Sequence, residues 1–194
     1  MLQRRKGVIG VVATALVAMI LLAASPAKAT VVVSLSPANQ SVDISDGTAT
    51  VDIIAVIPQS DAIVSWGLDI NLLGTSVSVS GSAVNEPTWT AATGVDGDGL
   101  AGLVPAPPGT AIWSDPVAIL LATVTFSLDS LGVTDLTLSD DNPADLSEGF
   151  ALDPPPIGAF ADVIYVPGSI TVTPEPASLA LLLLGGVACV SRRR

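Results

Sequence analysis

The chain has 194 residues, 18 of them acidic and seven basic, with no histidine and one cysteine. All the basic residues lie near the two ends, whereas every acidic residue except Glu175 lies in residues 30–173. So acidic a segment repels phosphate backbones, which excludes nucleic acid as a direct partner and favours cations or a basic protein. This segment has no histidine, lysine or cysteine for a nucleophile–base pair or a zinc site, so we predict that the protein is not an enzyme. A glycosidase-like pair of carboxylates is the remaining catalytic alternative.

Residues 1–29 have the three parts of a secretory signal peptide. A basic cluster at residues 4–6 is followed by an uncharged, mostly aliphatic stretch, and an Ala-Lys-Ala cleavage site stands at residues 27–29. A signal peptidase recognises this order, so we expect the segment to be removed on export. The alternative is an uncleaved membrane anchor.

The middle of the chain, residues 30–173, alternates apolar and polar side chains. Val64, Trp66, Leu68 and Ile70 alternate with small polar residues, so we expect them to face a core. Many β-branched residues and regular glycine-rich turns indicate an all-β domain, a single antiparallel β-sandwich of jelly-roll type with about 8–9 strands. The runs that we expect to form strands are 31–36, 48–57, 62–73, 75–80, 119–128, 133–138, 162–166 and 169–172.

Two segments, 81–116 and 139–160, interrupt the alternation. A compact domain rarely keeps a structureless loop longer than roughly 12–15 residues, so each segment either contains short strands or has a function. We expect one such strand at Thr110–Trp113. Trp89 and Trp113 either close the core or stack on sugar rings.

Carboxylates gather in the same two segments. Those of residues 95–99, VDGDG, are spaced like the opening of a calcium loop, although Leu100 stands where an EF-hand has Asp or Asn. The alternative is a pair of solvated acidic loops. No other cofactor is indicated. The candidate calcium ligands are Asp96, Asp98, Asp140, Asp141, Asp145 and Glu148.

The end of the chain, residues 174–194, joins a Pro-Glu-Pro triplet to a short apolar segment and a basic end. The apolar segment 177–190 makes roughly 21 Å of helix, less than the roughly 20 residues that a membrane span needs. The positive-inside rule keeps the terminal arginines in the cytoplasm. The motif consists of Pro174, Glu175, Pro176, Arg192, Arg193 and Arg194.

This arrangement resembles the PEP-CTERM sorting signal of bacterial surface proteins. The resemblance implies that an exosortase recognises the tail in the inner membrane, where it anchors the protein transiently, and cuts near the triplet. It also implies a bacterium that makes exopolysaccharide. The alternative is an ordinary tail anchor.

Residues 31–172 resemble the cohesin-like sandwich. Trp66 and Leu68 occupy the aromatic–apolar positions of its third strand, residues 121–126 carry the later Leu-Ala-x-x-x-Phe signature, and residues 168–172 give the closing strand. The Asp-Pro that usually follows the third strand is replaced by LLGTS, which puts a cohesin-type binding face in question. Another β-sandwich fold is the alternative.

We therefore predict an exported bacterial protein of the cell surface or extracellular matrix. Its expected role is structural or adhesive and linked to exopolysaccharide. The alternative is a cohesin-like module that binds a surface protein or a carbohydrate.

Overall fold

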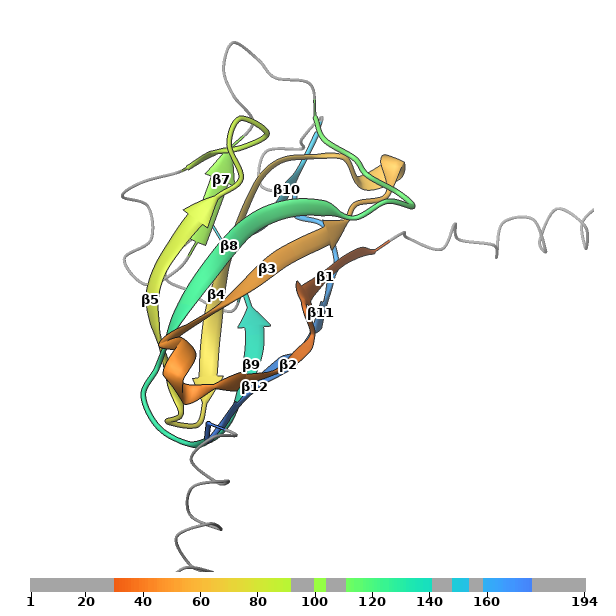
Figure 1. The fold of residues 1–194 in the computed structure, drawn as a ribbon. Coiled ribbons are helices and arrows are strands. Elements are labelled where there is room, and N and C mark those ends of the chain that lie inside the picture. The colour runs from red at the N-terminus through yellow and green to blue at the C-terminus, as the bar shows by residue number, and fades with distance from the viewer. Residues whose placement is uncertain (1–29, 92–99, 104–110, 141–147, 154–158, 176–194) are drawn as a thin grey trace, which may run out of the picture.

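The computed structural model describes residues 30–91, 100–103, 111–140, 148–153 and 159–175. Over these ranges the chain forms two β-sheets that pack face to face, which confirms the predicted all-β sandwich (Figure 1). No helix in these ranges is long and apolar enough to cross a membrane. The predicted signal peptide 1–29 and the predicted membrane segment 177–190 lie outside them.

The first sheet consists of β1 (Val31–Ser36), β3 (Thr48–Val56), β5 (Val77–Val84), β8 (Ile119–Leu128) and β11 (Val163–Val166). These strands lie in the order β11-β1-β3-β8-β5. All neighbours are antiparallel except β1 and β11, which run parallel.

The second sheet consists of β2 (Asn39–Asp43), β4 (Ile63–Leu73), β6 (Thr90–Ala91), β7 (Leu100–Leu103), β9 (Gly132–Ser139), β10 (Gly149–Leu152) and β12 (Gly168–Thr173). The order is β2-β12-β9-β4-β7-β6, with β10 also paired to β4. The long β4 holds this sheet together, because its first half pairs with β7 and β10 and its second half with β9. Short 3-10 turns stand at Ile44–Asp46 and Gln59–Asp61.

Two long strands pass from one sheet to the other on one side of the sandwich. β1 continues into β2 and β11 into β12, and the two pairs run parallel to each other. Pro37 and Pro167 stand at the crossings, where a residue without an N–H donor ends a ladder. Gly168 is required beside them, because a Cβ there would collide with the carbonyl oxygen of Ala38. The two crossings close this side of the sandwich.

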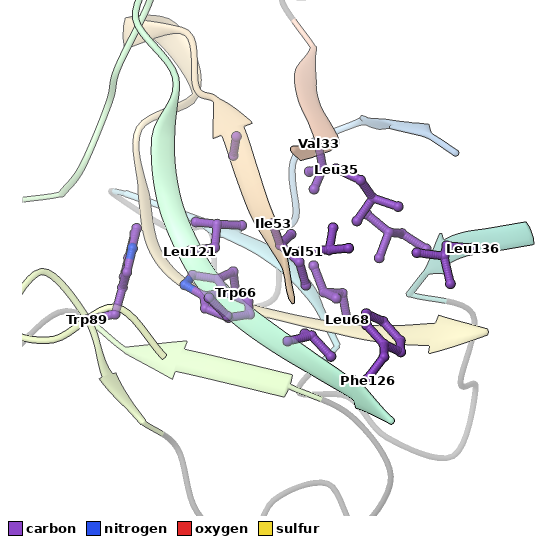
Figure 2. Packing of buried hydrophobic residues seen from close by; sticks show 14 of the residues in the cluster. Val33, Leu35, Val51, Ile53, Trp66, Leu68, Trp89, Leu121, Phe126 and Leu136 are labelled. Atoms are coloured by element: carbon purple, nitrogen blue, oxygen red, sulfur yellow. The ribbon is translucent and has the colours of Figure 1, made fainter. Parts of the chain in front are cut away.

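The core fills the space between the sheets, as Figure 2 shows for its largest side chains. Alternate residues of each strand point inward, as the period of a strand requires. Within β3 and the residue after it, Val51, Ile53, Ala55 and Ile57 are all fully or almost fully buried, as the sequence predicts. The other large buried side chains are Val31, Val33, Leu35, Ile63, Trp66, Leu68, Trp89, Leu121, Phe126, Leu136, Phe150 and Ile170.

The strand count differs from the prediction. The described residues form twelve strands, because the two unassigned segments contribute the short β6, β7 and β10, and because the polar run 39–43 forms β2. The predicted strand at Thr110–Trp113 is wrong: Ile112 makes a single isolated bridge with Ile63.

The predicted inward face of β4 is correct in its middle and wrong at its start. Trp66 and Leu68 are buried, and Ile70 packs against the core while partly exposed. At the start of the strand Ile63, not Val64, is buried. The register with β10 shifts here, because Leu152 pairs with Ile63 while Ala151 pairs with Ser65, so Val64 is the extra residue of a bulge.

Candidate binding surface

Most of the predicted calcium ligands lie outside the described residues. Glu148 is buried, and a carboxylate oxygen of Asp140 lies 3.6 Å from the place where a Cβ on Gly149 would stand. Within the described ranges no three acidic side chains come close enough to hold a metal ion. The calcium site therefore stays a prediction. The candidates outside the described residues are Asp96, Asp98, Asp141 and Asp145.

The predicted sorting motif is described only at its beginning. Pro174 and Glu175 follow β12 directly and are exposed. Pro176 and the arginines Arg192, Arg193 and Arg194 lie beyond the described residues. An exposed triplet just after the last strand fits a site at which an enzyme could reach the chain without unfolding the sandwich.

The two tryptophans of the first unassigned segment have different roles. Trp89 is fully buried, meets Trp66 edge to face with ring centroids 6.2 Å apart, and donates its indole N–H to the carbonyl of Leu120 at 3.3 Å. Trp113 is 50% exposed. Trp89 therefore closes the core, and only Trp113 has an indole face available to a ligand.

The outer face of the first sheet carries a second set of apolar side chains. Ile164 lies beside Val32, and Val32 beside Val56, across β11, β1 and β3. In the next row, Ser34 lies between Val166 and Ile54, and β8 extends the row. We call this set the outer apolar patch; it consists of Val32, Ile54, Val56, Leu120, Ile164 and Val166.

Burial confirms that the patch faces away from the core. In β1, Val31 and Val33 are fully buried, so Val32 between them points to the other face. Ile164 is 54% and Val166 is 39% exposed. Among the half-buried apolar residues, those that pack against the core do not include any member of the patch. The patch is therefore an apolar surface on the outside of the sandwich.

Charge near the patch is only negative. Asp52 lies one row further along β3, where it pairs with Ser36 and accepts a hydrogen bond from the Thr123 hydroxyl at 2.6 Å. Asp162 is exposed and precedes Ile164 by two residues on the same face. No lysine, arginine or histidine occurs in residues 30–175. The patch is thus bordered by carboxylates and has no cationic neighbour among the described residues.

The outer face of the second sheet is different in kind. One of its rows joins Asn39, Ser169, Asp135 and Leu73 across β2, β12, β9 and β4. Its polar side chains bond to each other: the Ser169 hydroxyl donates to the Asn39 side-chain oxygen at 2.9 Å, and an amide of Asn71 on β4 to Ser139. Leu73, at 64% exposed, is a single apolar residue on a polar surface, and such residues are normal.

Comparison with solved structures places this architecture. The cohesin module of a family 33 glycoside hydrolase from Clostridium perfringens matches with a TM-score of 0.52 and 11% identity, over 75% of this chain and 98% of that chain. The third ScaB cohesin of R. flavefaciens, in complex with a group 1 dockerin, matches with 0.52 and 13%, over 76% and 97%. A CaDoc0917–CaCohA2 complex matches with 0.51 and 18%, over 74% and 100%.

The domain has the fold of a cohesin module. At these identities the likeness concerns the fold alone, and it agrees with the resemblance that the strand motifs carry. No protein-family profile and no curated protein matches the sequence.

The outer apolar patch was not predicted from the sequence, although a signal for it exists. The runs VVV of β1 and DIIAVI of β3 contain apolar residues at inward and outward positions alike. A half-buried strand alternates, whereas a strand covered on both faces reads as a continuous apolar run. In an otherwise alternating domain, such a run indicates an outer face that something else covers.

Proposed function

We propose that this domain is a protein-binding module of an exported bacterial protein, and that the outer apolar patch is its docking surface. The observation that carries the proposal is a contiguous apolar area spread over four neighbouring strands. Contiguous exposed apolar patches on soluble domains mark interaction sites. The fold supports the proposal, because the R. flavefaciens cohesin with the same architecture is found bound to a dockerin.

The chemistry of the patch defines the partner. Apolar side chains form its centre, and the nearest charged groups are the carboxylates of Asp52 and Asp162. Interfaces combine a desolvated apolar centre with a polar rim of complementary charge. The partner is therefore a protein with an apolar face bordered by lysine or arginine, and the acidic domain attracts it from a distance.

A pair of matched variants tests this proposal on native cell envelope. Ile164→Asp places a charge in the patch, and Leu73→Asp places one at an equally exposed apolar position on the other sheet. We expect the unmodified domain and Leu73→Asp to retain the same partner, and Ile164→Asp to lose it. Equal retention by both variants would show that the patch is not the docking surface.

The termini suggest where the module works. We propose that residues 1–29 direct export, and that residues 174–194 anchor the chain transiently in the inner membrane until an exosortase processes it. Mass spectrometry of the mature protein should find a C-terminus close to Pro174–Pro176. Intact Arg192–Arg194 on most surface molecules would overturn this part of the proposal.

A structural or adhesive role in an exopolysaccharide matrix is the second candidate. The half-exposed indole of Trp113 favours it, because a sugar ring can stack on such a surface. If this role is correct, Trp113→Ala should reduce retention on immobilised native polysaccharide several-fold, while Ile164→Asp leaves it unchanged. Retention that is independent of Trp113 would remove the reason for this candidate.

A further inference from the structure

Strand β5 is an open edge of the first sheet. It pairs with β8 on one side only and is the last strand of the sheet (Figure 1). All residues from Ser78 to Ala83 are exposed, on both faces of the strand. Even Val79, which lies across from the buried Phe126, is 49% exposed. Neither face of this part of the strand is covered.

The edge lacks most of the features that keep strands apart. Natural edge strands are protected by charged side chains, prolines or bulges. Between Asp69 and Glu86 the sequence has no charged residue and no proline, although acidic residues occur throughout the rest of the domain. The neighbouring β8 has no charged residue either. One protection remains, a bulge at Ser80, where the register shifts between Val79 and Gly81.

The small side chains also allow another backbone to approach. The exposed part of β5 reads Ser-Val-Ser-Gly-Ser-Ala, so no long side chain stands in the way of a partner strand. An added strand would gain backbone hydrogen bonds along this edge, as in other cases of strand addition.

We propose that β5 pairs with β5 of a second copy of this chain, antiparallel about a twofold axis. The charge distribution favours a second copy. Two such domains carry only negative charge over residues 30–175 and repel each other in most orientations, but along β5 and β8 no carboxylate is brought opposite another. An antiparallel pair of identical strands is self-complementary and closes after two copies. Because the rest of the surface is repulsive at long range, the dimer becomes stronger as salt screens the charges.

Disulfide trapping tests the proposal in the full chain. Cys189→Ser removes the only native thiol, and single cysteines are then placed by Ser78→Cys, Ser80→Cys or Ser82→Cys, with Ser41→Cys on β2 as the control. Facing residues of an antiparallel pair have Cα atoms roughly 4.5–5.5 Å apart, a separation that suits a disulfide. We expect at least one β5 variant to form disulfide dimers about tenfold faster than the exposed control, and faster in high salt. If no β5 cysteine exceeds the control, or if salt slows the reaction, the proposal is wrong.

A charged variant separates strand pairing from chance collision. In the fastest β5 cysteine variant, Ser82→Asp brings like charges together across the axis and should slow dimer formation about tenfold. Ser41→Asp adds the same charge on another exposed edge and should leave the rate unchanged. Equal slowing by both substitutions would mean that only net charge matters, and β5 pairing would be rejected.

Discussion

At the scale of single residues, Trp66 connects the two sheets. Its indole is buried between β4 and β8, as Figure 2 shows, and packs edge to face on Trp89. Such aromatic pairs add roughly 0.5–1.5 kcal/mol to the stabilisation from their buried area. We expect Trp66→Ala to lower the free energy of unfolding by about 3–5 kcal/mol, measured by urea denaturation of residues 30–175.

Trp113→Ala serves as the control for Trp66→Ala. Half of Trp113 is exposed, so its removal should change the free energy of unfolding by no more than about 0.5 kcal/mol. A loss below about 1 kcal/mol for Trp66→Ala would contradict the burial of its indole.

Gly102 makes the position of Trp66 possible. A Cβ on Gly102 would stand 2.7 Å from the indole nitrogen of Trp66 and 2.8 Å from the adjoining ring carbon. Because the indole is held on all sides, we expect Gly102→Ala to lower the free energy of unfolding by about 1–3 kcal/mol. Gly81→Ala, where a Cβ meets nothing within 4 Å, should cause no loss, and equal melting temperatures for the two variants would contradict this packing.

At the scale of strands, a buried hydroxyl pair fixes the β4–β5 turn to β9. The side-chain oxygens of Ser76 and Thr134 lie 2.6 Å apart, and the Ser76 N–H donates to Thr134 at 3.1 Å. Thr134→Val keeps the shape but leaves both Ser76 groups without this acceptor, so we expect a loss of about 1–3 kcal/mol in thermal or urea unfolding. Thr137→Val, on the other face of β9, should be nearly neutral; equal losses would show that the pair is not important.

The sequence predicts the class of fold and most of the inward faces, because a strand with one dry face must alternate. It fails where the strands bulge. Leu121 is buried although Ala122 and Val124 already define the inward face of β8, since Ile53 pairs with Ala122 but Ile54 with Leu120. The carbonyls of Leu120 and Leu121 are then bonded by Asn85, and that of Leu120 also by Trp89. A bulge depends on residues far along the chain, so a local pattern does not reveal it.

The candidate site was harder to predict than the fold. Val32, Ile54 and Val56 resemble ordinary core residues in the sequence, and only the pairing of β11, β1 and β3 brings them together with Ile164 on one outer face. The parallel pairing of β1 with β11 joins segments from opposite ends of the domain. Neither composition nor spacing contains this information.

At the scale of the whole molecule, the acidic charge destabilises the compact state by self-repulsion. Added salt shortens the Debye length to about 8 Å at physiological ionic strength, so the melting temperature of residues 30–175 should rise with sodium chloride. If the charges are only screened, calcium and magnesium should act alike. A calcium site that includes Asp140 or Glu148 would instead stabilise at calcium concentrations where magnesium has no effect. A melting temperature that ignores both salt and calcium would contradict the electrostatic argument.

The claim that the outer apolar patch binds a protein is tested most directly on living cells. A photoreactive amino acid is placed at Ile164 in one strain and at Leu73 in another, since both positions are exposed and apolar but lie on different sheets. We predict that illumination joins the chain with the probe at Ile164 to one discrete protein, and that the probe at Leu73 gives no such adduct. The same adducts from both positions, or none from Ile164, would contradict the account.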